Sequence, residues 1–186
     1  MSSQGDGGSD VSAASGVPSS ATAFVLTTSD RSAAGTRADS SGAGIAERLR
    51  ALGFGSVETA VVPDDQAAIE AALRDAAGRH AVIVTTGGTG LTPRDVTPQA
   101  TRAVIDYEVP GLAEAMRAVG RSHTPLADLS RGVVGVLGRT LVINVPGSPR
   151  AALQSLSAVE SVLAHAIETL AGPHDHGSPG PGGEGG

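Results

Sequence analysis

The stretch AVIVTTGGTGLTPRDVTPQAT, residues 81–101, decides the fold class because it joins a strand to a glycine turn and then to a helix. Residues 81–86 hold a continuous apolar run, which is typical of a parallel strand covered on both faces. The strand ends at Gly87. Farther on, Thr97 predicts a helix N-cap, with Pro98 at the first helical position. This unit is characteristic of an α/β protein.

The turn after this strand holds Gly87, Gly88, Thr89 and Gly90. Glycine permits positive φ and close approach of the backbone to a ligand, so the amide groups can converge on an anion. Asp95 follows on a loop at the expected carboxyl edge of the sheet, where open α/β folds bind their ligands. Two interpretations stay open: a phosphate-binding loop beside a functional acid, or a glycine-rich loop that only turns the chain.

The rest of the chain alternates strands and helices. Strands are predicted over residues 22–28 and 57–62, and a hairpin over 132–144 with its turn at Gly138. Helices are predicted over residues 42–52, 65–77, 97–104 and 111–119, and a last one runs from Ser148 with an apolar stripe as far as Leu170. This order predicts right-handed crossovers and a parallel sheet with helices on both faces.

Length and composition allow one domain. The chain has 186 residues, of which 40% are hydrophobic. Residues 1–20 and 172–186 are rich in Ser, Gly and Pro, so we expect two disordered tails around a domain over residues 21–171. The absence of cysteine excludes disulfides, thiolate metal sites and a cysteine nucleophile.

Charge and hydropathy limit the partners. The formal charge is −6, but residues 1–20 and 171–186 carry four acids and no Arg, which leaves 15 acids and 13 Arg between them. Such a nearly balanced body argues against nucleic acid as a partner. No apolar run approaches the roughly 20 residues that span a bilayer, so we expect no membrane partner and a cytoplasmic protein.

Polar residues follow three other strands. Ser29 and Asp30 come after the first strand, and Asp39, Ser41 and Gly42 precede the next helix, where capping alone would explain them. Asp64 and Asp65 follow the second strand, and only one of them is needed as a cap. The turn Pro146, Gly147 and Ser148 leads into a helix N-terminus, which favours an anion.

Acidic residues beside turns whose backbone amides could bind phosphate indicate metal-assisted chemistry on a phosphorylated or nucleotide substrate. Carboxylates hold Mg²⁺ together with water and substrate oxygens, and Asp64 and Asp95 are the candidates. The chain has no Lys, which excludes a P-loop, and no Gly-x-Ser-x-Gly elbow, which argues against the usual hydrolase. His80, His123 and His165 have no spaced partner and are interpreted as structural or solvated; His174 and His176 lie in the C-terminal tail.

Five ordered segments resemble the Mog/MoaB family of molybdenum-cofactor biosynthesis proteins. They are SDRSAAGTRADSSG (29–42), VPDDQ (62–66), TTGGTGLTPRDVTPQAT (85–101), VPGLAEAMR (109–117) and NVPGSPRA (144–151). The resemblance implies a three-layer αβα sandwich with a mostly parallel sheet and a small C-terminal hairpin. It also implies a homotrimer that could hand its product to a molybdate-inserting partner.

In the Mog branch, the resemblance implies a Mg²⁺-dependent reaction of ATP with molybdopterin that yields adenylylated molybdopterin and pyrophosphate. The family's catalytic acids match Asp64 and Asp95, and Asp65 is then the cap, although the adjacent pair leaves that choice open. We expect the amides of residues 87–90 to bind nucleotide phosphate and residues 146–148 another part of the ligand. Ser29, Asp30 and residues 39–42 would complete the pocket. The alternative is a MoaB-type protein that binds molybdopterin without catalysis.

Overall fold

One six-stranded mixed sheet forms the centre of the protein. The computed structural model describes residues 16–36 and 38–172. The strands lie in the order β2-β1-β3-β6-β5-β4. β5 is antiparallel to β6 and β4 to β5, whereas the other pairs are parallel, so the predicted mostly parallel sheet with a C-terminal hairpin is confirmed. The strands are β1 (Thr22–Thr28), β2 (Ser56–Val62), β3 (Val82–Thr86), β4 (Tyr107–Glu108), β5 (Val134–Leu137) and β6 (Thr140–Val145).

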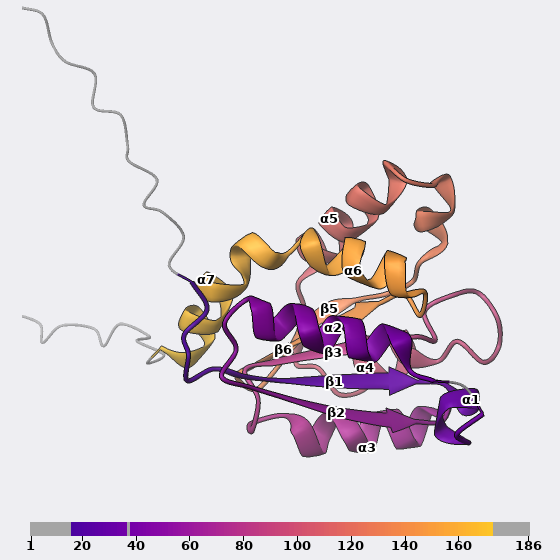
Figure 1. Ribbon diagram of the computed structural model, residues 1–186, viewed down its shortest axis with the longest axis horizontal. Coiled ribbons are helices and arrows are strands. Elements are labelled where there is room, and N and C mark those ends of the chain that lie inside the picture. The colour runs from indigo at the N-terminus through magenta and orange to yellow at the C-terminus, as the bar shows by residue number, and fades with distance from the viewer. Residues whose placement is uncertain (1–15, 37, 173–186) are drawn as a thin grey trace, which may run out of the picture.

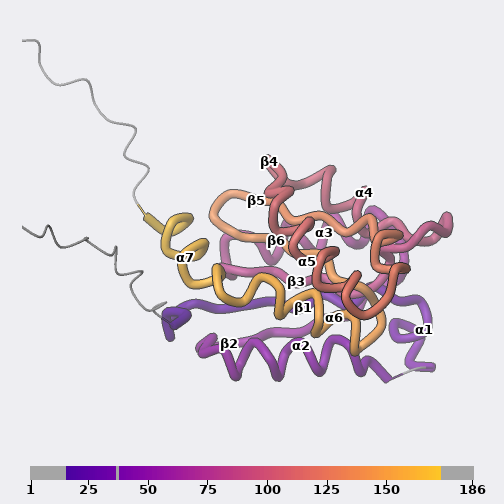
Figure 2. The backbone as a smooth tube through the Cα atoms, turned by 90° about the horizontal axis from the view of Figure 1, so that it is seen from above, coloured from indigo at the N-terminus to yellow at the C-terminus, as the bar shows by residue number. Residues whose placement is uncertain are grey.

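Helices cover both faces of this sheet (Figure 1). One face carries four helices, and Figure 2 shows α6 between α2 and α5 on it. They are α2 (Ser40–Ala51), α5 (Pro110–Arg121), α6 (Pro149–Ser157) and α7 (Glu160–Ala171). The other face carries α3 (Gln66–Ala76) and α4 (Thr97–Arg102). The three-layer αβα sandwich is therefore confirmed.

The central strands are buried because consecutive side chains enter different layers of the core. In β3, Val82 and Val84 join the cluster under α2 and α6, whereas Ile83 joins the cluster under α3 and α4. Full burial of such side chains stabilises the fold by about 1.5–3 kcal/mol each. The edge strand β2 is only partly covered. The continuous apolar run predicted this arrangement correctly.

Three short elements were not predicted from the sequence. α1 (Asp30–Ala33), the 3₁₀ helix η1 (Pro125–Leu129) and β4 have no buried residues, so no apolar periodicity marks them. The hairpin was predicted correctly, and Gly138 occupies its turn with φ of +62°. Residues 1–15 and 173–186 of the predicted tails lie outside the described residues, and Val17 packs against the core.

Two predictions about helices are wrong. The last helix is broken between α6 and α7, where Val159 N donates to Leu156 O at 3.0 Å in a tighter 3₁₀-type turn that keeps Val159 fully buried. Thr97 is also not a helix cap: the N-cap of α4 is Val96, and Thr97 is the first helical residue. The Thr97 hydroxyl lies 3.1 Å from that of Thr28 in the interior, so a tertiary contact occupies the group that a cap would use.

Candidate functional site

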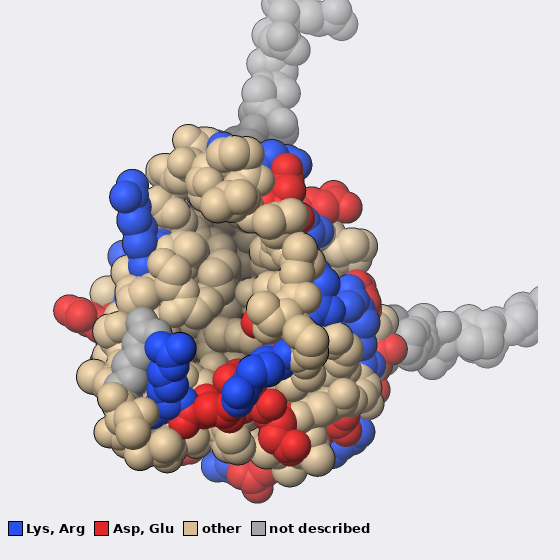
Figure 3. All heavy atoms as spheres, turned by 90° about the vertical axis from the view of Figure 1, so that its right-hand side faces the viewer, with Lys and Arg blue, Asp and Glu red and all other residues tan. Residues whose placement is uncertain are grey.

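A cavity of about 590 Å³ opens at the carboxyl ends of the parallel strands. The strand ends are aligned: Thr28 pairs with Val62, and Thr86 pairs with Val145. The loops that follow these four residues therefore surround one space. Figure 3 shows this face hollowed at its centre, with acidic and basic side chains gathered along the lower rim. The lining includes Ser29, Asp30, Asp39, Ser41, Asp64, Gly87, Gly88, Asp95, Gly147 and Ser148.

Asp64 is held by the loop that follows β1. The backbone amide of Asp30 donates to Asp64 Oδ2 at 3.2 Å, and the amide of Asp64 donates to Asp30 Oδ1 at 3.0 Å. This reciprocal pair ties the ends of β1 and β2 together. Asp30 also forms an ion pair with Arg94, which is exposed at the rim. Asp64 itself has no basic partner within the described part of the chain.

The neighbouring Asp65 has a separate task. Its Oδ1 accepts the amide of Ala68 at 2.8 Å and caps α3. Asp64 lines the cavity and Asp65 does not. The geometry thus assigns the cap to Asp65 and leaves Asp64 available for a ligand.

Asp95 is fixed by its own loop. Its Oδ2 accepts both the amide and the hydroxyl of Thr92 at 2.7 Å. Burial by itself raises the pKa of Asp95, but the hydrogen bonds from Thr92 and Gly90 and the charge of Arg131 outweigh it, so the net pKa is lowered. Asp95 is therefore a carboxylate at neutral pH.

Asp64 shows the opposite shift. Burial raises its pKa, and the negative charge of Asp95 raises it further. Both carboxylates line the same cavity. An arrangement of like charges in a cavity favours the binding of a cation. Among the described residues, no group of three or more His, Cys, Asp or Glu side chains could hold a metal ion, so further ligands would come from substrate and water.

The glycine turn after β3 passes close to the end of β1. Gly87 has φ of +103°, and a Cβ added to it would lie 2.4 Å from Thr28 O. Gly88 has φ of +59°, and a Cβ there would lie 2.5 Å from Thr97 Oγ1. Both residues line the cavity. Only glycine fits these positions. The amide of Gly87 is already used, because it donates to Val145 O at 3.3 Å.

Asp39 lines the cavity but is already occupied. Its Oδ1 accepts the amide of Gly42 at 2.8 Å, as the N-cap of α2, and the hydroxyl of Ser41 at 3.3 Å. Its Oδ2 accepts the hydroxyl of Thr27 at 2.6 Å. Gly42 is covered by this cap and lies outside the lining. The capping interpretation therefore accounts for Asp39 and Gly42, and Ser41 lies at the wall.

Three other predicted residues face elsewhere. Thr89, Gly90 and Pro146 line a second cavity of about 280 Å³ under α5 and α6, on the other side of the glycine turn. Conversely, the main cavity is lined by residues that the sequence did not single out, Arg31, Ser32, Thr92 and Arg94. One signal could have identified them: Arg31 and Ser32 lie in the segment 29–42, and Thr92 and Arg94 lie in the segment 85–101.

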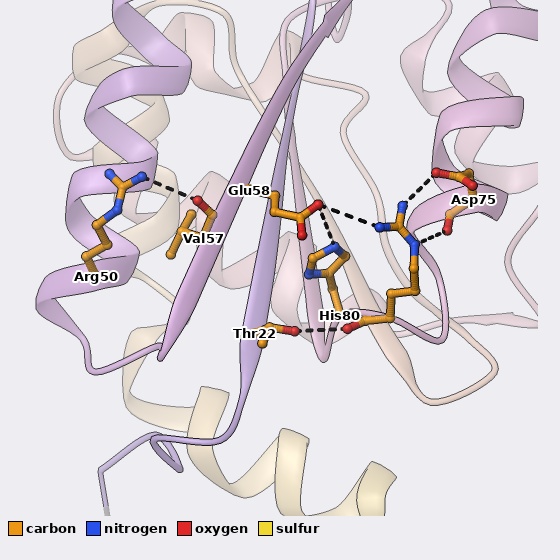
Figure 4. Close-up of polar contacts among 7 residues, drawn as sticks. Thr22, Arg50, Val57, Glu58, Asp75 and His80 are labelled. Atoms are coloured by element: carbon orange, nitrogen blue, oxygen red, sulfur yellow. Dashed lines mark hydrogen bonds and ion pairs between the residues drawn. The ribbon is translucent and has the colours of Figure 1, made fainter.

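The histidines lie away from this cavity. His80 is buried near the amino ends of the strands, stacks on Phe24 with ring centroids 5.6 Å apart, and places Nε2 3.4 Å from Glu58 Oε2 (Figure 4). His123 and His165 are exposed. None of the three lines the cavity. Within residues 16–36 and 38–172, no helix is long and apolar enough to cross a bilayer.

Known proteins resemble this chain in sequence and in fold. Residues 24–165 match the family model described as a probable molybdopterin binding domain. A molybdopterin adenylyltransferase from Helicobacter pylori is 35% identical over 152 residues, 80% of this chain and 86% of that protein. One from Haemophilus influenzae is 45% identical over 107 residues, 56% of this chain and 54% of that protein.

A solved structure extends the likeness to three dimensions. The molybdopterin biosynthesis Mog protein from Mycobacterium ulcerans has a TM-score of 0.78 and 41% sequence identity, covering 82% of this chain and 100% of that one. The matches do not all span whole proteins. This chain spans 19%, 49% and 54% of the length of the first three curated relatives that it matches.

Proposed function

The chain belongs to the Mog/MoaB family of molybdopterin-binding domains, and we propose that its domain, residues 21–171, transfers AMP from ATP to the terminal phosphate of molybdopterin. An oxygen of that phosphate attacks the α-phosphorus of ATP. The bond from the α-phosphorus to the bridging oxygen breaks, and pyrophosphate leaves with the electron pair. The products are adenylylated molybdopterin and pyrophosphate.

The observation that carries this proposal is that Asp64 and Asp95 line one cavity together with Gly87 and Gly88. The attacking phosphate is already a nucleophile, so the site needs no strong general base. It needs charge neutralisation and alignment, which supply most of the rate in phosphoryl chemistry. Two carboxylates without a basic partner at Asp64, together with backbone amides, meet that need.

The residues present fit Mg²⁺. Asp64 and Asp95 would hold it, because both line the cavity and a cation would favour the ionised form of Asp64, whose pKa is raised by burial and by the charge of Asp95. When bound, Mg²⁺ supplies neutralisation of the charge on the reacting phosphates. The other ligands would be phosphate oxygens and water.

The remaining residues bind and orient the two substrates. The amide of Gly88 would take nucleotide phosphate, whereas that of Gly87 donates to Val145 O at 3.3 Å. Ser148 is the N-cap of α6 without a side-chain cap bond, so the first amides of α6, beside Gly147, are available to a second anionic group. Ser29, Asp30 and Ser41 would close the wall on the pterin or adenylate side.

We also propose a cytoplasmic homotrimer that passes its product to a molybdate-inserting partner. The support is the family likeness and the exposed apolar side chains of Leu126 and Leu129 on η1, which a subunit contact could cover. Light scattering at several concentrations tests the assembly. A monomer at every concentration would contradict it.

An adenylylation assay tests the proposed reaction. Purified protein is incubated with molybdopterin, ATP and Mg²⁺, and adenylylated molybdopterin and pyrophosphate are quantified. We expect turnover in the wild type and none in Asp95→Ala. Asp64→Ala should behave like Asp95→Ala, whereas the matched control Asp65→Ala should stay active and lose only about 1 kcal/mol of stability as an N-cap.

The same assay separates the two hypotheses about this family. Tight molybdopterin binding without turnover in the wild type would favour the MoaB-type binder. Turnover in Asp95→Ala would contradict the mechanism while leaving the activity in place.

A further inference from the structure

Arg131 contacts the Asp95 loop from the side opposite the cavity. It lies between η1 and β5, and its backbone amide donates to Thr89 O at 2.9 Å. Its side chain donates from Nε to Gly90 O at 2.6 Å and from Nη2 to Asp95 O. One residue thus binds both limbs of the loop that carries Asp95.

Arg131 cannot act on a ligand directly. It is absent from the lining of the main cavity and instead lines a separate cavity of about 310 Å³ with Arg102 and Arg117. Arg131 can therefore affect the reaction in two ways, by holding the loop or by its charge, which lowers the pKa of Asp95.

The loop has few other restraints. Residues 91–94 are exposed, and Leu91 is 64% exposed. Thr97 N closes the base of the loop on Gly88 O at 3.2 Å, and Asp95 N donates to Thr92 O at 3.0 Å within it. These bonds are internal to the segment 88–97. At the exposed rim, Arg94 also forms an ion pair with Asp30. Arg131 is the residue that ties the two limbs to the β5 side of the sheet.

We propose that Arg131 is a positioning residue for the transferase reaction: it clamps the Gly90 and Asp95 carbonyls and so holds the Asp95 carboxylate in the cavity with Asp64. The inference rests on the proposed function. The planar guanidinium suits this task because its fixed fork serves two carbonyls at once. A Lys ammonium has the same charge but not the fork, so charge alone should not replace Arg131.

Arg131→Gln tests the clamp in the full-length protein. We expect kcat to fall by roughly 10²-fold, as for a misplaced catalytic group, and the KM for ATP to change much less, because Arg131 bonds to Thr89, Gly90 and Asp95 and not to Gly88. Arg131→Lys should recover little of the loss. In Arg131→Ala, added guanidinium ion should restore part of kcat and ammonium should not.

Arg117→Gln is the matched control. Arg117 is also partly buried, lines the same cavity and donates to a backbone carbonyl, that of Gly132 at 3.2 Å, but it does not touch the loop. We expect its kcat to stay at the wild-type value. A wild-type kcat in Arg131→Gln, or an equal loss in both variants, would overturn the proposal.

Amide hydrogen exchange over residues 88–96 gives a measurement that does not need turnover. Exchange should accelerate in Arg131→Gln and Arg131→Lys and not in Arg117→Gln. If the wild type proves inactive as a transferase, this accelerated exchange would still support the clamp while the proposed function fails. Equal exchange in all variants would overturn the clamp, whatever the activity.

Discussion

The two ends of the parallel strands carry charged clusters that differ in how the charges are balanced. At the amino ends, Arg79 Nη2 lies 2.6 Å from Asp75 Oδ2 and Arg79 Nη1 lies 3.6 Å from Glu58 Oε2. His80 Nε2 approaches the same Glu58 oxygen at 3.4 Å (Figure 4). Each acid at this end has a basic neighbour.

At the carboxyl ends the acids are held mainly by hydrogen-bond donors without charge. Asp64 accepts the amide of Asp30, and Asp95 accepts the amide and hydroxyl of Thr92. These bonds fix the carboxylates but leave the charge of Asp64 uncompensated. The two clusters therefore differ in kind: the amino-end cluster neutralises its own charges, whereas the carboxyl-end site positions charges for a ligand to neutralise.

The first prediction concerns turnover and has the greatest magnitude. It compares two variants that each remove one acidic charge, one at the carboxyl ends of the strands and one at the amino ends. Asp64→Asn should lower kcat by roughly 10²–10³-fold, the usual loss for one electrostatic contact to a transition state. Its thermal midpoint at neutral pH should not fall, because the raised pKa of Asp64 means that its ionised form opposes folding. Glu58→Gln should leave kcat unchanged. Adenylylation kinetics and thermal unfolding of both variants check this, and equal losses of kcat would contradict the contrast.

The second effect is steric and compares two glycines with positive φ. Gly78, near the amino ends, has φ of +79° and open space around its Cβ position, so Gly78→Ala should cost about 1–2 kcal/mol of conformational strain. Gly87→Ala adds a clash with Thr28 O, and overpacking brings its cost to roughly 3 kcal/mol or more. Urea unfolding measures both. Equal losses of unfolding free energy in the two variants would contradict the predicted clash at Gly87.

The sequence predicts the layers because apolar runs and turn residues are local signals. The run before Gly87 predicted β3, Gly138 marked the hairpin, and parallel strands place their carboxyl ends together, which brought Asp64 and Asp95 into one hypothesis. The same logic could not choose between Asp64 and Asp65, because both follow one strand. Only the bond to Ala68 N makes the choice.

Other features have no local signal. The apolar stripe continues through Val159, so periodicity could not show the break between α6 and α7. Thr97 with Pro98 matches a cap motif, but the fold places Thr28 beside the hydroxyl. Arg131 donates to backbone carbonyls, which every residue has, so no sequence motif predicts its contacts.

A third effect is on the pH dependence of stability, with opposite signs at the two ends. Burial lowers the pKa of His80, with Glu58 raising it and Arg79 lowering it in smaller measure. The stability from neutral His80 is therefore fully present above its unfolded pKa of 6.5 and is lost as pH falls through the lowered folded pKa. His80→Gln should flatten this acid loss in urea unfolding.

Asp64 behaves in reverse. Its pKa is raised, so the stability from protonated Asp64 is fully present below the unfolded value of 3.8 and is lost as pH rises through the folded pKa. Asp64→Asn should remove this loss of stability with rising pH.

The same measurement checks His80. Parallel curves of stability against pH for His80→Gln and the wild type would contradict the role of His80.

The smallest effect should come from the exposed ion pair at the amino ends. The side chains of Arg79 and Asp75 are 50% and 79% exposed, so water and salt screen their attraction. Asp75→Asn should lower the free energy of unfolding by about 0.2–1 kcal/mol at low salt, with kcat unchanged. Added salt should erase the difference, because screening weakens the pair only in the wild type. Urea unfolding at low and high ionic strength measures it. A loss of unfolding free energy that persists in high salt would contradict this prediction. Asp75 would then stabilise the protein by packing or by its effect on helix α3, and not by pairing its charge.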